Sequence, residues 1–187
     1  MSNLLGRTKR DKIQNMSSLI RYNNIFHVKS ENVAEHSFYV TLYANEICNF
    51  FNIPNNEKLI ILEKALTHDV HEIELSDIPH NVKENIKVLN NICLEYEEDF
   101  NNKNFKEITL KYNKLTSEQK TIIDNIVLLA DIMDVYYYAN NEIKFGNIDF
   151  IEIKDKAQNR INECLDNLKI FFTEEQINNF NKLIKIY

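Results

Sequence analysis

Apolar residues recur at steps of three and four along most of the chain, which is the spacing of one face of an α-helix. The series His36, Val40, Tyr43, Ile47 and Phe50 follows this spacing and predicts a helix from about 32 to 51. The same spacing predicts further helices over about 13–20, 57–73, 82–100, 105–115, 117–138 and 150–187, the last as one long helix or a pair.

The chain holds only two glycines and two prolines among its 187 residues. Sandwiches, barrels and doubly wound folds need many tight turns, for which these two residue types are preferred. We therefore predict an all-α fold, and the length suggests one domain. Two distant glycines also exclude every glycine-rich phosphate loop.

The net charge of −6 gives no basic footprint for a nucleic acid polymer, so we expect a small ligand. The three cysteines, Cys48, Cys93 and Cys164, are widely spaced, which favours reduced core residues in a cytoplasmic protein. No stretch approaches the roughly 20 apolar residues of a membrane span, and the first residues lack the apolar core of a signal peptide. We expect no membrane partner.

Ionisable residues interrupt three of the predicted apolar faces. These residues are His36 on the first, His68, Asp69 and Glu72 on the second, and Asp131 on the third. Burial without partners costs each of them several kcal/mol. One interpretation is that they pair with one another, as a core histidine bonded to a buried carboxylate.

The other interpretation is a metal site. Two imidazoles and two carboxylates together suit Zn, Mn, Fe, Co or Mg, and a mixed set is typical of a catalytic centre with open water positions. Adjacent His68 and Asp69 can both reach one ion, because neighbouring helical side chains diverge by about 100°. Glu72 lies one turn further on, beside His68, and can hold a water molecule without binding the ion.

Five short elements resemble, in order and spacing, the HD-domain metal-dependent phosphohydrolases, and most closely their bacterial 5′-deoxynucleotidase branch. The resemblance covers about 13–146, with C-terminal helices at about 150–187, and we expect 1–187 to form a single HD domain. The elements are Arg21-Tyr22, Glu31-Asn32-Val33-Ala34-Glu35-His36-Ser37, His68-Asp69-Val70-His71-Glu72, Ser76-Asp77-Ile78-Pro79 and Ala130-Asp131.

The resemblance implies an orthogonal helical bundle around one divalent ion. It assigns the metal ligands to His36, His68, Asp69 and Asp131, and the carboxylate that orients or deprotonates the attacking water to Glu72. Because Asp131 follows Ala130 as in the family pattern, Asp134 is expected to be no ligand, and Asp134→Ala is expected to keep its metal.

The resemblance also implies substrate contacts. Arg21 matches a phosphate-binding arginine, and Asp77 matches a residue close to the sugar and the scissile bond. Two positions depart from the branch: Tyr22, near the sugar, stands where tryptophan is frequent, and Ser76 stands where glycine commonly precedes the aspartate. His71 is expected to be a bystander, and His27 and His80 have no expected role.

We therefore expect an enzyme that removes the 5′-phosphate from deoxyribonucleoside 5′-monophosphates with one divalent ion. Removal of triphosphate from a deoxynucleoside triphosphate, hydrolysis of a signalling nucleotide and a non-catalytic nucleotide-binding module are the alternatives. Arg21 is the only basic residue in the matching elements, which favours a single phosphate, although Lys83 lies one turn beyond them. Family analogy suggests a homodimer.

Overall fold

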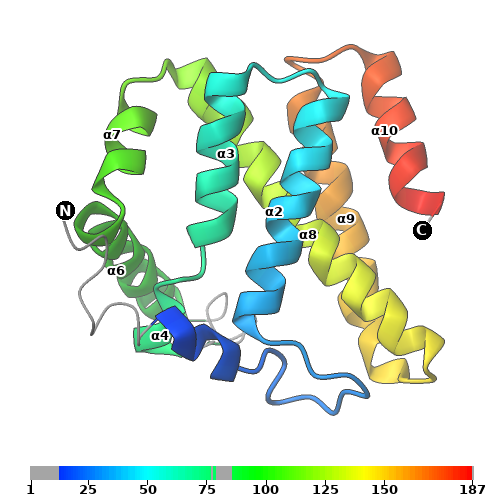
Figure 1. Ribbon diagram of the computed structural model, residues 1–187. Helices are drawn as coiled ribbons and strands as arrows, with labels where there is room; N and C mark the ends of the chain where they lie inside the picture. Colours follow the sequence, from blue (N-terminus) through cyan, green and yellow to red (C-terminus); the bar gives the residue numbers. More distant parts are fainter. Residues whose placement is uncertain (1–12, 77, 79–85, 187) are drawn as a thin grey trace.

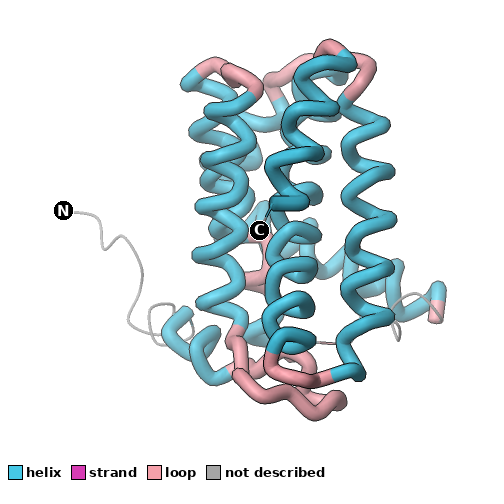
Figure 2. Tube along the Cα trace, turned by 90° about the vertical axis from the view of Figure 1, so that its right-hand side faces the viewer, coloured by secondary structure: helices cyan, strands magenta, loops and turns pink. Residues whose placement is uncertain are grey.

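The computed structural model describes residues 13–76, 78 and 86–186, which form a helical bundle (Figures 1 and 2). Apart from one isolated antiparallel bridge between Ile20 and Asn32, the regular structure of the described residues is helical, which confirms the all-α prediction. The elements are η1 (Asn15–Ser18), α2 (Val33–Phe50), α3 (Asn55–Thr67), α4 (Glu72–Leu75), α6 (Lys87–Asn104), α7 (Lys106–Asn113), α8 (Ser117–Lys144), η2 (Ile148–Phe150), α9 (Ile151–Leu168) and α10 (Glu174–Ile186).

Helix α8 is the centre of the bundle. It packs against α2, α3 and α9, and it runs obliquely across α2 and α3 in Figure 1. Its apolar face, with Ile126 and Leu129 fully buried, joins the core formed with those helices and α10. This placement brings α2, the end of α3 and the middle of α8 together.

Two of these helices begin with reciprocal side-chain caps. The Asn32 side chain accepts a hydrogen bond from the Glu35 backbone N–H at 2.9 Å, and the Asn32 N–H donates to the Glu35 carboxylate at 3.2 Å. Thr116 and Gln119 cap α8 in the same way. Such caps satisfy N–H groups that the first turn leaves unpaired, and they fix the residue at which each helix begins.

The predicted helix over 57–73 is interrupted. Helix α3 ends at Thr67, and α4 begins at Glu72 after a tight turn closed by i→i+3 bonds, among them Glu72 N–H to Asp69 O at 3.0 Å. Two histidine side chains form hydrogen bonds with backbone carbonyls near this turn. His68 Nδ1 lies 2.8 Å from Ala65 O, and His71 Nδ1 lies 2.9 Å from His68 O. The histidines therefore satisfy the carbonyls that the ending helix leaves free.

Ser76, which follows α4, has a φ of 65°. Glycine adopts this left-handed region without steric cost, whereas other residues do so at a cost of about 1–3 kcal/mol. The backbone conformation at position 76 thus favours glycine, the residue that is common here in the branch that the sequence resembles. Asp77, Pro79, His80 and Lys83 lie outside the described residues. No described helix combines the length and apolar character that a bilayer span requires.

Candidate metal centre

Four ionisable side chains from three segments meet around one ring nitrogen. His36 Nε2, on α2, lies 3.2 Å from His68 Nε2 and 3.4 Å from Asp69 Oδ2, both at the end of α3. Asp131 Oδ1, on α8, lies 3.2 Å from the same nitrogen, and His68 Nε2 lies 3.3 Å from Asp69 Oδ2. The structure thus brings together all four residues that sequence reasoning selected as ligands.

These separations suit a shared ion. Nitrogen and oxygen donors bind divalent metals of this class at about 2.0–2.2 Å, so neighbouring donors of one ion lie about 3.0–3.5 Å apart. The separations of His36 from His68, Asp69 and Asp131, and of His68 from Asp69, are between 3.2 and 3.4 Å and fall within this interval. Nitrogen and carboxylate oxygen together match the donor preferences of the first-row divalent metals.

Hydrogen bonds orient both imidazoles toward the centre. His36 Nδ1 lies 2.6 Å from Asp134 Oδ2, which can only accept, and 2.7 Å from Arg21 Nη1, which can only donate; the shorter contact favours a proton on Nδ1. His68 Nδ1 likewise donates to Ala65 O. In the neutral rings the lone pairs at both Nε2 atoms are therefore directed at the shared position, as metal ligation requires.

The centre has an excess of negative charge. Burial and Arg21 lower the pKa of His36, but hydrogen bonds to Asp131, Asp134 and Asp69 raise that pKa well above its ordinary value. Burial raises the pKa of Asp69, but the adjacent His68 and hydrogen bonds from His36 hold it well below its usual range. The carboxylates of Asp69, Asp131 and Asp134 all lie next to His36, so the centre offers negative charge to a divalent cation.

A second group of donors lies behind His36. Oxygen atoms of Glu31 and Asp134 approach His36 Nδ1 closely enough to resemble another metal site. Arg21 occupies it instead, because its Nη1 lies 2.7 Å from Glu31 Oε2 and 3.3 Å from Asp134 Oδ2. Burial and the charge of Asp134 raise the pKa of Glu31 to about 7, although Arg21 lowers it. The guanidinium is the cation of this second cluster.

Backbone pairing places Arg21 at this point. Arg21 N–H donates to Glu31 O at 2.9 Å, and Val33 N–H donates to Leu19 O at 2.9 Å, so the two ends of the loop before α2 are joined. The Tyr22 ring stacks on Tyr138 with centroids 5.0 Å apart. Within the described part of the chain, its buried hydroxyl has no hydrogen-bond partner.

The remaining predicted residues have different placements. Glu72 is 5% exposed at the start of α4, next in sequence after the turn that carries His68 and Asp69. His71 is buried in that turn, and His27 Nδ1 lies 3.1 Å from Ile25 O in the loop before α2. Sequence reasoning missed Asp134 and Glu31 as parts of the site: Asp134 interrupts an apolar helical face as the ligands do, whereas Glu31 lies in a polar stretch that gives no such signal.

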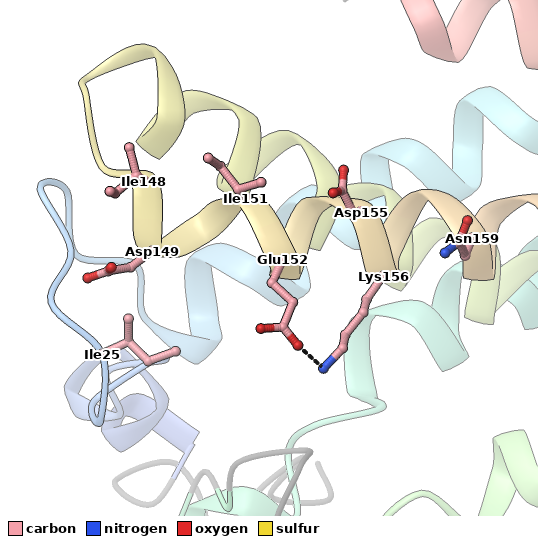
Figure 3. A pocket seen from close by; sticks show the side chains of 8 residues that line it. All are labelled: Ile25, Ile148, Asp149, Ile151, Glu152, Asp155, Lys156 and Asn159. Carbon is pink, nitrogen blue, oxygen red and sulfur yellow. Dashed lines mark ion pairs between the residues drawn. The ribbon is translucent and has the colours of Figure 1, made fainter.

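Two hollows of about 640 Å³ each lie on the described surface, and their lining residues distinguish them. One lies at the start of α9, where Ile25 and Asp149 are among the lining residues and Figure 3 shows a Glu152–Lys156 ion pair of 2.8 Å. The other is a cleft between α3, α6, α7 and α8, and its lining includes His68, Asp69 and Asp131. The cleft gives access to the donors, so it is the candidate active site.

Comparisons with known proteins agree with this geometry. The sequence model of the family described as 5′-deoxynucleotidase YfbR-like matches residues 11–180. A 4′-phosphooxetanocin A phosphatase from Priestia megaterium is 31% identical over 90% of this chain and 85% of its own length. A 5′-deoxynucleotidase from Yersinia pseudotuberculosis is 26% identical, over 86% of this chain and 84% of its own.

Solved structures show the same fold. An HD phosphohydrolase of cyanophage S-2L, bound to dA and one catalytic Zn²⁺ ion, matches with a TM-score of 0.67 at 16% identity, over 95% of this chain and 96% of its own. An HD-domain phosphohydrolase from Listeria innocua matches with a TM-score of 0.68 at 23% identity, over 89% of this chain and 85% of its own.

Proposed function

Because the chain belongs to the YfbR-like 5′-deoxynucleotidase family, we propose that His36, His68, Asp69 and Asp131 hold the ion of a metal-dependent 5′-deoxynucleotidase. The enzyme removes the 5′-phosphate from deoxyribonucleotides as an HD-domain phosphohydrolase. The observation that carries the site assignment is the compact donor triad of His36, His68 and Asp69, with Asp131 Oδ1 3.2 Å from His36 Nε2.

A divalent ion, when bound, lowers the pKa of water towards 7 and polarises the phosphoryl group. The Zn²⁺ ion of the cyanophage enzyme supports zinc as one candidate, and manganese, cobalt, iron and magnesium also suit this donor set. Glu72 is proposed to orient the attacking water and accept its proton, a contribution of about 10²- to 10⁴-fold.

Arg21 is proposed to contact the phosphate. Its planar guanidinium carries five N–H donors, and the contacts to Glu31 and Asp134 involve Nη1 alone, so the proposal assigns the phosphate to the other nitrogens. Tyr22 and Asp77 are proposed to lie near the sugar, where they would disfavour a 2′-hydroxyl.

The charges of the cleft support a monophosphate. Its acidic lining residues outnumber its single lysine, Lys64, which is already paired with Asp124 at 2.7 Å. A triphosphate brings several further negative charges, which this lining would repel. The acidic residues of the cleft are Asp69, Glu97, Glu98, Asp124 and Asp131.

A nucleotide panel tests the proposal. Protein loaded separately with Zn, Mn, Co, Mg or Fe is assayed for phosphate release from deoxyribonucleoside monophosphates, ribonucleoside monophosphates and deoxynucleoside triphosphates. We expect kcat/KM for deoxyribonucleoside monophosphates to exceed the others at least tenfold, about 1.4 kcal/mol of transition-state discrimination. Release of inorganic triphosphate would assign the triphosphohydrolase alternative, and binding without turnover would assign a non-catalytic module.

The proposal also includes a cytoplasmic location and a homodimer. The three cysteines are free and buried, in agreement with a reducing compartment. Family analogy supports the dimer, which sedimentation velocity of the purified protein would test.

A further inference from the structure

We propose that Asp134 is a positioning residue that keeps the proton of His36 on Nδ1 in the presence of Arg21, and so keeps Nε2 free to bind the ion. Asp134 lies on α8, one turn after the proposed ligand Asp131, and it is 3% exposed. The inference rests on the proposed ligation of the ion by His36.

A single carboxylate oxygen of Asp134 contacts one nitrogen of His36 and one nitrogen of Arg21. Asp134 Oδ2 lies 2.6 Å from His36 Nδ1 and 3.3 Å from Arg21 Nη1. The two nitrogens are themselves only 2.7 Å apart. With a proton on Nδ1, both nitrogens are donors and cannot bond to each other, so the shared acceptor is what holds them at this separation.

Without that acceptor the two donors would conflict. The contact of Arg21 Nη1 with His36 becomes favourable if Nδ1 loses its proton and accepts from the guanidinium, which never deprotonates. The neutral ring then carries its proton on Nε2, and a protonated nitrogen cannot bind a metal ion. Arg21 would therefore favour the wrong tautomer, and Asp134 prevents this.

The neighbouring groups leave Arg21 little freedom to move away. Glu31, 7% exposed, binds the same Nη1 at 2.7 Å, and the backbone of Arg21 is paired with that of Glu31. The loss of Asp134 is thus expected to change the ring of His36 before it displaces the guanidinium.

Three variants test this inference through zinc affinity, measured by competition with a chromophoric chelator. Asp134→Leu removes the acceptor at similar volume, and we expect it to weaken zinc binding by about 10- to 100-fold, the usual effect of losing such a partner. Asp134→Asn keeps one acceptor oxygen and should weaken binding less. Arg21→Met with Asp134→Leu removes the competing donor as well, so it should bind zinc more tightly than Asp134→Leu alone.

Arg21→Met alone measures how much the loss of the positive charge tightens zinc binding while Asp134 is present. A gain from Arg21→Met that is larger in the Asp134→Leu background than in the wild type is the result that a merely structural role of Asp134 would not give. Asp166→Asn, which breaks an exposed Asp166–Lys169 ion pair of 2.7 Å on α9, is the matched control and should bind zinc as the wild type does. In the zinc-loaded wild type, ¹⁵N-edited NMR should show the hydrogen-bonded Nδ1 proton of His36.

Two outcomes would overturn the inference: zinc binding by Asp134→Leu equal to the wild type, or a gain from Arg21→Met that is no larger in the Asp134→Leu background than in the wild type. If Asp134→Leu does not fold, a neutral His36 that carries its proton on Nε2 in the metal-free wild type, measured by the same NMR experiment, overturns the inference equally. A wild type that binds no divalent ion would instead refute the proposed metal site.

Discussion

Single side chains of this site divide into donors that face the shared position and groups that hold those donors. His36 belongs to both kinds, since its Nε2 faces the centre while its Nδ1 binds Asp134. The chemistry proposed for Glu72 is of a third kind, because it requires a basic oxygen but no bond to the ion.

Glu72→Gln separates chemistry from ligation. Glutamine keeps the size and helix propensity of glutamate but loses the basic oxygen, so we expect unchanged metal content and nucleotide binding with kcat lowered at least 10²-fold. Elemental analysis and single-turnover phosphate release measure the two effects. Near-normal turnover would remove Glu72 from the mechanism, and loss of metal would make it a ligand.

The four proposed ligands were accessible to sequence reasoning because each places a charge on an otherwise apolar helical face. Asp134 interrupts the same face of the same helix, yet the sequence predicts that Asp134→Ala keeps its metal. The further inference about Asp134 depends on its contact with His36, which joins α8 to α2 across 98 residues of sequence. No local sequence pattern predicts such a contact. Supporting groups of a site become visible only when the helices are packed.

At the scale of elements, periodicity predicts helices well and their interruptions poorly. The stripe of Ile61, Ala65, His68 and Glu72 keeps helical spacing across the end of α3, so the pattern predicts one helix where the structure has two. The break depends on imidazoles that bond to backbone carbonyls, which hydrophobic spacing does not report. The predicted helix start at 117 is confirmed, because the Thr116 cap is local chemistry, whereas α8 continues to Lys144, beyond the predicted end at 138.

The loop before α2 depends on the end of α8. Glu142, 1% exposed, accepts hydrogen bonds from the N–H groups of Val28 at 2.7 Å and Lys29 at 2.8 Å, and from the Asn147 amide at 2.8 Å. Burial raises the pKa of Glu142, but these bonds hold it below its usual value. The same loop carries Arg21 and Tyr22, so this carboxylate supports the substrate side of the site.

Glu142→Gln should destabilise the protein. The amide NH₂ of glutamine would face at least one donor, and a mispaired buried group costs about 1–3 kcal/mol. For a chain of this length that corresponds to a melting temperature lower by roughly 2–10 °C at pH 7. The exposed substitution Glu46→Gln on α2 is the control, and circular dichroism follows the unfolding.

The effect of Glu142→Gln on stability should depend on pH. A carboxyl group whose folded pKa is depressed contributes stability above its unfolded pKa of about 4.3, and this contribution is lost as the pH falls through the folded pKa. The difference in melting temperature between wild type and Glu142→Gln should therefore shrink below about pH 4. A difference that grows on acidification would contradict this account.

At the scale of the whole molecule, the proposed ion joins the segments that form the core. Its ligands come from α2, the end of α3 and α8, and the same helices share one continuous apolar core with α9 and α10. A single domain over 1–187 stays a prediction. Burial raises the pKa of Asp69 and Asp131, but the imidazoles of His36 and His68 hold both values below their usual range, so contacts across these segments stabilise the charged carboxylates.

Removal of the ion should therefore lower the stability of the entire fold. Binding to the folded state alone stabilises a protein by about 2.7 kcal/mol at a ligand concentration one hundred times Kd. For a chain of 150–250 residues this shifts the melting temperature by roughly 5–11 °C. We expect chelator-treated protein to melt lower by this amount, and added zinc or manganese to restore the melting temperature.

Asp131→Asn is the matched comparison for this measurement, since it removes one proposed ligand charge from α8 and leaves α2 and α3 unchanged. Without the ion this variant should melt somewhat below the chelated wild type, because His36 and His68 hold the pKa of Asp131 below its usual value despite burial, and such a carboxylate contributes stability at pH 7. With zinc it should gain less than the wild type does. If zinc raises the melting temperature of both proteins equally, the ion is bound elsewhere. If the melting temperature of the wild type does not depend on metal, the three helices do not share an ion.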